Sequence, residues 1–263
     1  MSGEKPEIIA LIPAAGRGTR LGQIPCSKEL LPLIPTVGNP YAPWPGSRVA
    51  IEDTLYMLAE NGVLSAVIVV APEKTDIQPY LENFPCPDID VRFVERASSP
   101  SVPHTLAAAL ADISGTEFAL VFPDIVFSPR DTLRRLALQH ATNGADITLA
   151  LVPSDRGDKV DMVTTSPAGD VLDILPKPGA GRRGLTWIAA LWNARFSAYL
   201  ADFVARQKEV TAGEIHVSDV FNAARTDGLA VRALTIMDGK ALDIGTPEDL
   251  EALWRLGFDD YRR

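Results

Sequence analysis

Five short apolar runs occur in the first 153 residues of the chain, and segments with the apolar spacing of helices lie between some of them. The runs cover residues 8–14, 66–72, 91–95, 118–124 and 146–153. Helices are predicted at residues 51–61, 132–140 and 247–256, the last with Thr246 as its N-cap residue. Strands that alternate with helices are typical of a mainly parallel sheet with helices on both faces, so we expect an α/β fold.

The pattern changes after about residue 154, where short runs of alternating polarity replace the continuous apolar ones. These runs predict antiparallel or edge strands laid beside the first sheet. We expect a single domain over residues 1–263, with a core at roughly 7–153, an elaboration at roughly 154–245 and a C-terminal helix at roughly 247–257. Residues 34–47 are rich in proline and glycine and predict a long loop, a feature that is often functional in compact domains.

Composition excludes several classes of partner. The 263-residue chain is 46% hydrophobic and has a formal net charge of -9, so it lacks the basic face that binds nucleic acid or an anionic membrane. No apolar stretch approaches the roughly 20 residues that cross a bilayer, and the first residues do not resemble a signal peptide. Two cysteines and three histidines form neither a disulfide framework nor a spaced zinc site. We therefore expect a cytoplasmic protein with neither a nucleic-acid nor a membrane partner.

The first apolar run is followed by a glycine-rich, basic loop, PAAGRGTRLGQIPCSKELLPL, at residues 13–33. Glycines directly after a strand let the backbone turn sharply and approach a ligand closely. The loop is not a dinucleotide fingerprint, because Leu21 takes the place of the third glycine, and it lacks the Gly-Lys-Ser/Thr of a P-loop. Glycine amides can still cradle a triphosphate while Arg20 and Lys28 supply two cations, as a loop that holds departing pyrophosphate requires.

The same residues resemble the signature of nucleotidyltransferases that make nucleoside-diphosphate sugars. They are similar to those of glucose-1-phosphate thymidylyltransferases and, at residues 13–16 and 27–32, to those of bacterial UTP-glucose-1-phosphate uridylyltransferases. The resemblance implies the Rossmann-like fold of the nucleotide-diphospho-sugar transferases, Mg²⁺ as cofactor, and a nucleoside triphosphate and a phosphorylated small-molecule acceptor as partners. Many relatives are oligomers, so it also allows a homo-oligomer. The positions that it assigns to nucleotide binding are Pro13, Ala14, Ala15, Gly16, Gly18, Thr19, Arg20 and Lys28.

Two aspartates are implied as metal ligands. Asp124 follows the apolar run LVFP, and a carboxylate that closes a strand lies at the carboxyl edge of the sheet, where ligands bind in open α/β folds. Asp243 stands in ALDIGTPEDL, which resembles the second metal motif of the family. Mg²⁺ is commonly held by one or two carboxylates together with substrate phosphates, so this pair would suit it.

The expected acceptor site departs from the family pattern. Lys177, in DVLDILPKP, matches the lysine that holds the sugar phosphate, but Pro176 replaces the glutamate that contacts sugar hydroxyls. Ala190 stands where the family has a glycine near the acceptor. The identity of the acceptor therefore does not follow from the motifs.

Aromatic residues near these motifs have more than one interpretation. The base-reading region corresponds to residues 95–107 and differs from the family, so His104 is either a base or phosphate contact or an ordinary residue at a helix start. Trp187 and Trp192 alternate with apolar residues on a predicted strand, which favours core positions over stacking platforms.

Together the motifs predict transfer of a nucleoside monophosphate from a triphosphate, dTTP or UTP, to a sugar 1-phosphate. Arg20 and Lys28 would stabilise the leaving pyrophosphate, and Lys177 would orient the attacking phosphate. Two alternatives remain: a cytidylyltransferase acting on a non-sugar phosphate or phosphonate, and a catalytically silent paralogue that binds a nucleotide sugar and regulates a partner. A glycosyltransferase would need an Asp-x-Asp metal motif at a central strand, and we find none there.

Overall fold

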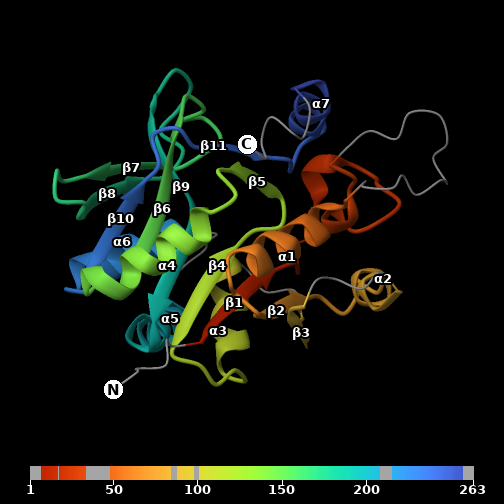
Figure 1. Cartoon of the computed structure of the whole chain (residues 1–263), viewed down its shortest axis with the longest axis horizontal. Coiled ribbons are helices and arrows are strands. Elements are labelled where there is room, and N and C mark those ends of the chain that lie inside the picture. The colour runs from red at the N-terminus through yellow and green to blue at the C-terminus, as the bar shows by residue number, and fades with distance from the viewer. Residues whose placement is uncertain are drawn as a thin grey trace.

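The computed structural model describes residues 7–16, 18–33, 48–83, 88–97, 101–207 and 215–256. Figure 1 shows a twisted sheet with helices packed on both of its faces. The predicted loop at residues 34–47 lies outside the described residues, as does part of the predicted base-reading region. Within the described part, no helix is both long enough and apolar enough to span a bilayer.

The main sheet has the strand order β10-β6-β9-β4-β1-β2-β3. These strands are β1 (Ile8–Pro13), β2 (Ser65–Val70), β3 (Asp90–Glu95), β4 (Glu117–Val121), β6 (Ile147–Ser154), β9 (Gly184–Asn193) and β10 (Val231–Thr235). Strand β1 pairs in parallel with β2 and β4, β2 with β3, and β10 with β6. Strand β9 runs antiparallel to both of its neighbours, β4 and β6. The sheet is therefore mixed and mostly parallel, as the sequence predicts.

Two small antiparallel pairs accompany the main sheet. Strands β7 (Met162–Thr165) and β8 (Val171–Leu175) pair with each other, and β7 also touches β9. Strands β5 (Ile125–Ser128) and β11 (Lys240–Asp243) form a separate two-stranded sheet. The expected strand at residues 118–124 is thus shorter than predicted: β4 ends at Val121, the chain turns, and β5 begins at Ile125 in the separate sheet.

Both faces of the main sheet are buried, which explains why its strands are continuously apolar. Leu11 and Ile12 of β1 have no exposed surface, yet they belong to different core clusters, because successive side chains of a strand point to opposite faces. Residues of α3 (Val102–Leu110), α5 (Ala194–Gln207) and α6 (Val217–Thr226) pack in the cluster with Leu11. Those of α1 (Ala50–Glu60), α2 (Ile77–Asn83) and α4 (Thr132–Asn143) pack in the other.

The predicted helices form with small changes at their ends. Helix α1 is followed by Gly62 in the left-handed region, with φ of 79°, as expected for a residue that ends a helix. Helix α4 continues three residues beyond its predicted end, to Asn143, before Gly144 stops it in the same way. Helix α7 (Pro247–Leu256) has the predicted bounds, and the Thr246 hydroxyl accepts a hydrogen bond from the Asp249 amide at 3.3 Å.

Strand β9 confirms the expectation of an antiparallel strand in the second half of the chain but not that of an edge strand. Residues 184–193 form β9, which lies in the middle of the main sheet and is buried over most of its length. The alternation of tryptophan with smaller residues there does not mark an edge strand. It reflects different side-chain sizes on two covered faces.

A third buried cluster positions the glycine-rich loop. Leu21 and Leu31 of that loop pack with Leu242 of β11 and Leu253 of α7. The indole Nε1 of Trp254 also donates a hydrogen bond to the Pro32 carbonyl at 3.0 Å. Two segments more than 200 residues apart in sequence therefore lie side by side near the carboxyl ends of the strands (Figure 1).

Candidate active site

The glycine-rich loop leaves β1 and makes two short 3-10 turns, η1 (Thr19–Leu21) and η2 (Lys28–Leu30). Gly18 and Gly22 adopt left-handed φ values of 64° and 72°, which an L-residue with a side chain rarely takes. A Cβ added to Gly18 would lie 3.6 Å from the aliphatic stem of Lys28, so the lysine crosses the loop at this glycine. The loop therefore folds back on itself and brings its second cation towards the sheet.

Lys28 reaches Asp124, which lies in the tight turn between β4 and β5. The ammonium Nζ of Lys28 donates a hydrogen bond to Oδ2 of Asp124, and both side chains are largely buried. Burial lowers the pKa of Lys28, but the charge and hydrogen bond of Asp124 outweigh it and leave that pKa raised. Lys28 is therefore a fully charged cation held against a carboxylate.

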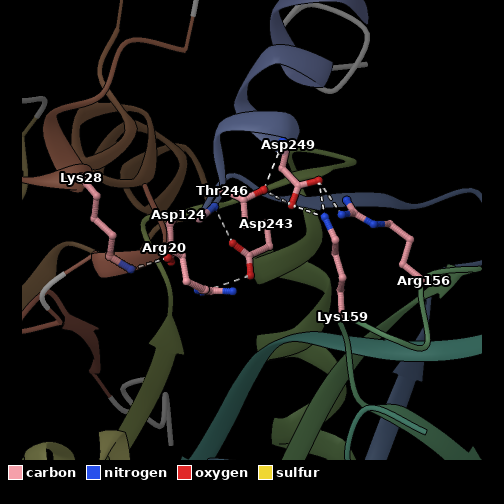
Figure 2. A network of polar contacts seen from close by, with 9 residues as sticks. Arg20, Lys28, Asp124, Arg156, Lys159, Asp243, Thr246 and Asp249 are labelled. Atoms are coloured by element: carbon pink, nitrogen blue, oxygen red, sulfur yellow. Dashed lines mark hydrogen bonds and ion pairs between the residues drawn. The ribbon is translucent and has the colours of Figure 1, made fainter. Parts of the chain in front are cut away.

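Asp243 lies beside this pair because β11 is antiparallel to β5, with Asp243 opposite Ile125. The pKa of Asp243 is raised by its burial and by the nearby Asp124 carboxylate, although the Gly245 amide donates to its Oδ1 at 2.7 Å. Arg20 Nη2 stands 3.9 Å from the other oxygen, Oδ2. Figure 2 shows Lys28 against Asp124 and, next to this pair, Arg20 against Asp243.

This arrangement fits a divalent cation. The lysine ammonium shows that Asp124 accepts a cation, and added positive charge would relieve the repulsion between the buried Asp124 and the partly exposed Asp243. Among the described residues, no group of three or more His, Cys, Asp or Glu side chains is placed to hold a metal. A cation here would therefore use Asp124 and Asp243 and take its remaining oxygens from ligands, as Mg²⁺ commonly does.

A cleft of about 150 Å³ opens next to Asp243. Its wall includes Lys177, the predicted acceptor residue, which follows β8 and has a left-handed φ of 37°. Basic and acidic side chains from the turn between β6 and β7 also line the cleft, and aromatic side chains contribute apolar surface. The lining residues used below are Arg156, Lys159, Asp161, Lys177, Asp243, Phe122 and Trp187.

Gly157 fixes the two segments that form one wall of this cleft, the turn after β6 and the loop after β8. The Gly157 amide donates to the Arg182 carbonyl at 3.3 Å, and the Gly157 carbonyl accepts from the Gly179 amide at 3.0 Å. A Cβ on Gly157 would come within 2.9 Å of the Gly179 carbonyl oxygen. The turn after β6 and the loop that carries Lys177 can therefore pack this closely only around a glycine.

Helix α7 is tied to the same wall through Asp249. Its carboxylate accepts hydrogen bonds from Arg156 at 2.5 Å, from Lys159 at 2.8 and 3.0 Å, and from the Thr246 hydroxyl at 2.8 Å. Figure 2 shows these side chains converging on Asp249 from two elements. Burial raises the pKa of Asp249, but the bonds from Lys159, Thr246 and Arg156 outweigh it and lower that pKa.

The other predicted residues lie in different environments. Ala190 has no exposed surface and pairs within the sheet with Leu120 and Leu149, so it cannot contact an acceptor. Thr186, Trp187 and Ile188 of the same strand line the cleft instead. The substitution of glycine by alanine that the sequence highlighted is thus a change in the core.

Among the residues expected to bind nucleotide, Ala14 is buried and Pro13 is half-buried, whereas Gly16 and Thr19 are exposed. Ala15 and Lys28 line a wide groove of about 910 Å³ between the glycine-rich loop and the turn after β2. His104 lies in the first turn of α3, where its Nδ1 is 2.8 Å from the Ser101 hydroxyl.

The sequence motifs did not indicate the residues that fix Ser27 and Glu29, the two neighbours of Lys28 in the chain. Asp76 accepts hydrogen bonds from the Ser27 amide at 2.7 Å and from the Ser27 hydroxyl at 2.6 Å. Lys74 binds Glu29, which has no exposed surface, at 2.6 and 2.8 Å. The available signal in the sequence was a glutamate directly before the apolar residues Leu30 and Leu31, but its partner Lys74 lies 45 residues away and no local pattern identifies it.

Comparison with known proteins places the chain in a family. Residues 10–189 match the MobA-like NTP transferase domain, so the chain belongs to this family of nucleotidyltransferases. A bifunctional protein GlmU from Azotobacter vinelandii is 32% identical over 206 residues, which are 70% of this chain and 42% of that protein. Its counterpart from Corynebacterium efficiens is 21% identical over 248 residues, which are 92% of this chain and 48% of that protein. The chain thus spans less than half the length of either relative.

Solved structures show the same fold at low sequence identity. A Bacillus anthracis protein, described as a glucose-1-phosphate thymidylyltransferase and solved with sucrose, has a TM-score of 0.76 and 18% identity over 96% of both chains. A UDP-glucose pyrophosphorylase solved with UDP-glucose has a TM-score of 0.75 and 17% identity over 96% of this chain and 98% of its own. The fold is therefore that of the nucleotide-diphospho-sugar transferases.

Proposed function

We propose that the chain transfers a nucleoside monophosphate from a nucleoside triphosphate to a sugar 1-phosphate, giving a nucleoside-diphosphate sugar and pyrophosphate. The observation that supports this most is the position of the Lys28–Asp124 pair. It stands beside Asp243 and Arg20, and Asp243 in turn borders the cleft that contains Lys177. Asp124 and Asp243 would thus lie between the cations that bind the triphosphate and the cleft that binds the acceptor.

In this reaction an oxygen of the acceptor phosphate attacks the α-phosphorus of the triphosphate. The bond from that phosphorus to the bridging oxygen breaks, and pyrophosphate leaves with the electron pair. Arg20 and Lys28 would stabilise the charge on the leaving group, and Lys177 would orient the acceptor phosphate. A phosphate oxygen is already ionised near neutral pH, so the site needs no general base.

Mg²⁺ held by Asp124 and Asp243 would neutralise charge on the phosphates and bring donor and acceptor together. The remaining work is positioning. Lys28 is held by its contact with Asp124, and Ser27 and Glu29 on either side of it are fixed by Asp76 and Lys74. Such preorganised charges stabilise a transition state without having to reorganise during the reaction.

We propose dTTP or UTP as the donor, a choice that rests on the sequence resemblance and is supported by the thymidylyltransferase and UDP-glucose pyrophosphorylase among the structural relatives. The test is pyrophosphate release with Mg²⁺ and each of ATP, GTP, CTP, UTP and dTTP, crossed with hexose 1-phosphates, phosphocholine and simple phosphonates. We expect signal with UTP or dTTP and a hexose 1-phosphate. Signal only with CTP and a non-sugar acceptor would replace this proposal with the cytidylyltransferase.

Silence across the whole set would contradict the proposed activity. A nucleotide sugar that still raised the melting temperature would then favour a binding protein without turnover.

A further inference from the structure

We propose that Asp161 determines acceptor specificity by accepting hydrogen bonds from the hydroxyl groups of a sugar ring. This inference rests on the proposed function and names the side chain that reads the acceptor beyond its phosphate. Asp161 lies just before β7 and lines the cleft that also contains Lys177 and Asp243. Hydrogen bonds to neighbouring side chains hold the Asp161 carboxylate in one orientation at the cleft.

Two consecutive hydrogen bonds, from Trp187 to Ser218 and from Ser218 to Asp161, fix the Asp161 carboxylate. The hydroxyl of Ser218, a residue of α6 with no exposed surface, donates to Oδ2 of Asp161. The same hydroxyl accepts a hydrogen bond from the indole Nε1 of Trp187 at 2.9 Å. A serine hydroxyl has one proton, and this proton goes to Asp161, so the direction of every bond in the chain is set.

Asp161 can therefore act only as an acceptor towards the cleft. An ionised carboxylate has about four lone-pair sites, and Ser218 uses one of them. The group that fits the remaining sites is a donor, either a hydroxyl or an ammonium. Lys177 lines the same cleft, and its positive charge disfavours a cationic acceptor. Arg156 and Lys159 also line the cleft, but their charges are paired with Asp249.

Apolar surface in the cleft also suits a sugar ring. Trp187 lines the cleft, and its ring centroid lies 5.9 Å from that of Phe122, which lines it too. A sugar presents hydroxyls at its edge and C–H bonds on its faces, so it can meet a carboxylate and an aromatic surface at once. Aromatic walls with a few fixed polar groups are the usual composition of small-molecule sites.

The test compares Asp161→Asn with Asp158→Asn in steady-state assays. Asp158 is exposed on the same turn and is not among the residues lining the cleft, so the control removes the same charge nearby. The acceptor is the hexose 1-phosphate that wild type uses best, and the readouts are the KM for this acceptor and for the triphosphate. We expect Asp161→Asn to raise the acceptor KM by about 10- to 100-fold, the loss expected for hydrogen bonds to a charged group. The triphosphate KM should change by less than about twofold, and Asp158→Asn should match wild type.

Monodeoxy analogues of the same sugar phosphate make the test specific. For the analogue that lacks the hydroxyl bound by Asp161, the acceptor KM of wild type should rise by the same factor as Asp161→Asn produces with the full sugar. The acceptor KM of Asp161→Asn should not rise further with this analogue. Ser218→Ala keeps the Asp161 carboxylate but removes the hydrogen bond that orients it. We therefore expect a smaller rise in the acceptor KM than for Asp161→Asn. Equal acceptor KM values for the two Asp→Asn variants, or equal rises in both KM values for Asp161→Asn, would overturn the role of Asp161.

Failure of the proposed function gives a different result. Wild type would then release no pyrophosphate with any sugar phosphate, or would prefer an acceptor that carries an ammonium group. In the second case Asp161→Asn would raise the KM for the ammonium-bearing acceptor, and the assignment of Asp161 to sugar hydroxyls would be wrong.

Discussion

At the scale of single residues, the site depends on which charged groups lie opposite each other. The motifs predicted that Arg20, Lys28, Asp124 and Asp243 would act together, and the structure brings the four side chains close to one another. Their proximity was predictable because loop motifs and strand ends have fixed places in such a fold, whereas their joint action remains a prediction. The role given to Ala190 did not fit, because its burial depends on which strands β9 lies between. That is a long-range property that no local pattern shows.

Replacing Lys28 with Met should separate its structural role from its role in turnover. Methionine keeps the aliphatic stem beside Gly18 but removes the cation, so we expect pyrophosphate release to fall by about 100-fold or more. Stability should fall as well, because Asp124 is left in a buried position without its partner.

Adding Asp124→Asn to this variant should recover stability without recovering activity. The double-mutant cycle, measured by chemical denaturation, should give a coupling of about 1–3 kcal/mol. Strictly additive losses of stability would show that the two side chains do not depend on each other.

At the scale of elements, the cleft beside Asp243 is built largely by connections between strands, of which the sequence motifs indicate only the loop with Lys177. The turn after β6 and the loop after β8 pack around Gly157, and α7 is tied to the same turn by Asp249. Helices α1, α4 and α7 and the parallel strands β1, β2, β3, β4 and β6 were predictable from the apolar patterns. The central position of β9 and the division between β4 and β5 were not, because they depend on pairing with distant strands.

Gly157→Ala should distort the cleft wall. The new Cβ would stand 2.9 Å from one backbone oxygen and 3.1 Å from another, so the backbone itself must shift. Overpacking of this kind typically costs about 1–3 kcal/mol of folding free energy. We also expect the acceptor KM to rise several-fold while the triphosphate KM stays near that of wild type.

Gly184→Ala is the matched control for this change. Its Cβ would meet only the sulfur of the Met162 side chain, at 3.2 Å, and a flexible side chain can move. Equal effects of the two substitutions on the acceptor KM would contradict the role of Gly157 in locking the wall.

Asp249→Asn should lower stability most at neutral pH. The pKa of Asp249 is lowered in the folded protein, so its contribution is fully present above the ordinary aspartate value near 4 and is lost as the pH falls through the folded value. We expect a loss of about 2 kcal/mol at pH 7 and a smaller difference from wild type at pH 3. Denaturation curves at several pH values, with Asp158→Asn alongside, measure it. A difference that grew as the pH fell would have the wrong sign.

At the scale of the whole molecule, the fold brings distant segments to one edge of the sheet. The glycine-rich loop comes from the start of the chain, Asp124 from its middle, and Asp243 and α7 from its end. The third buried cluster packs the loop against α7 and β11, so the basic loop and the second carboxylate are held in one unit. This architecture defines the fold, and the match of residues 10–189 defines the family. The proposed choice of donor and acceptor would depend on a few side chains in the clefts.

The most direct test of the central claim is pyrophosphate release by wild type, Asp124→Asn and Asp158→Asn, with Mg²⁺, the best triphosphate and the best sugar 1-phosphate. We predict that Asp124→Asn keeps its fold, judged by its melting curve, but loses about 1000-fold or more in turnover, because it removes a charge at the reacting phosphates. The exposed Asp158→Asn variant should react at the rate of wild type. Near-normal turnover by a folded Asp124→Asn variant would contradict the assignment of this carboxylate pair as the centre of the reaction.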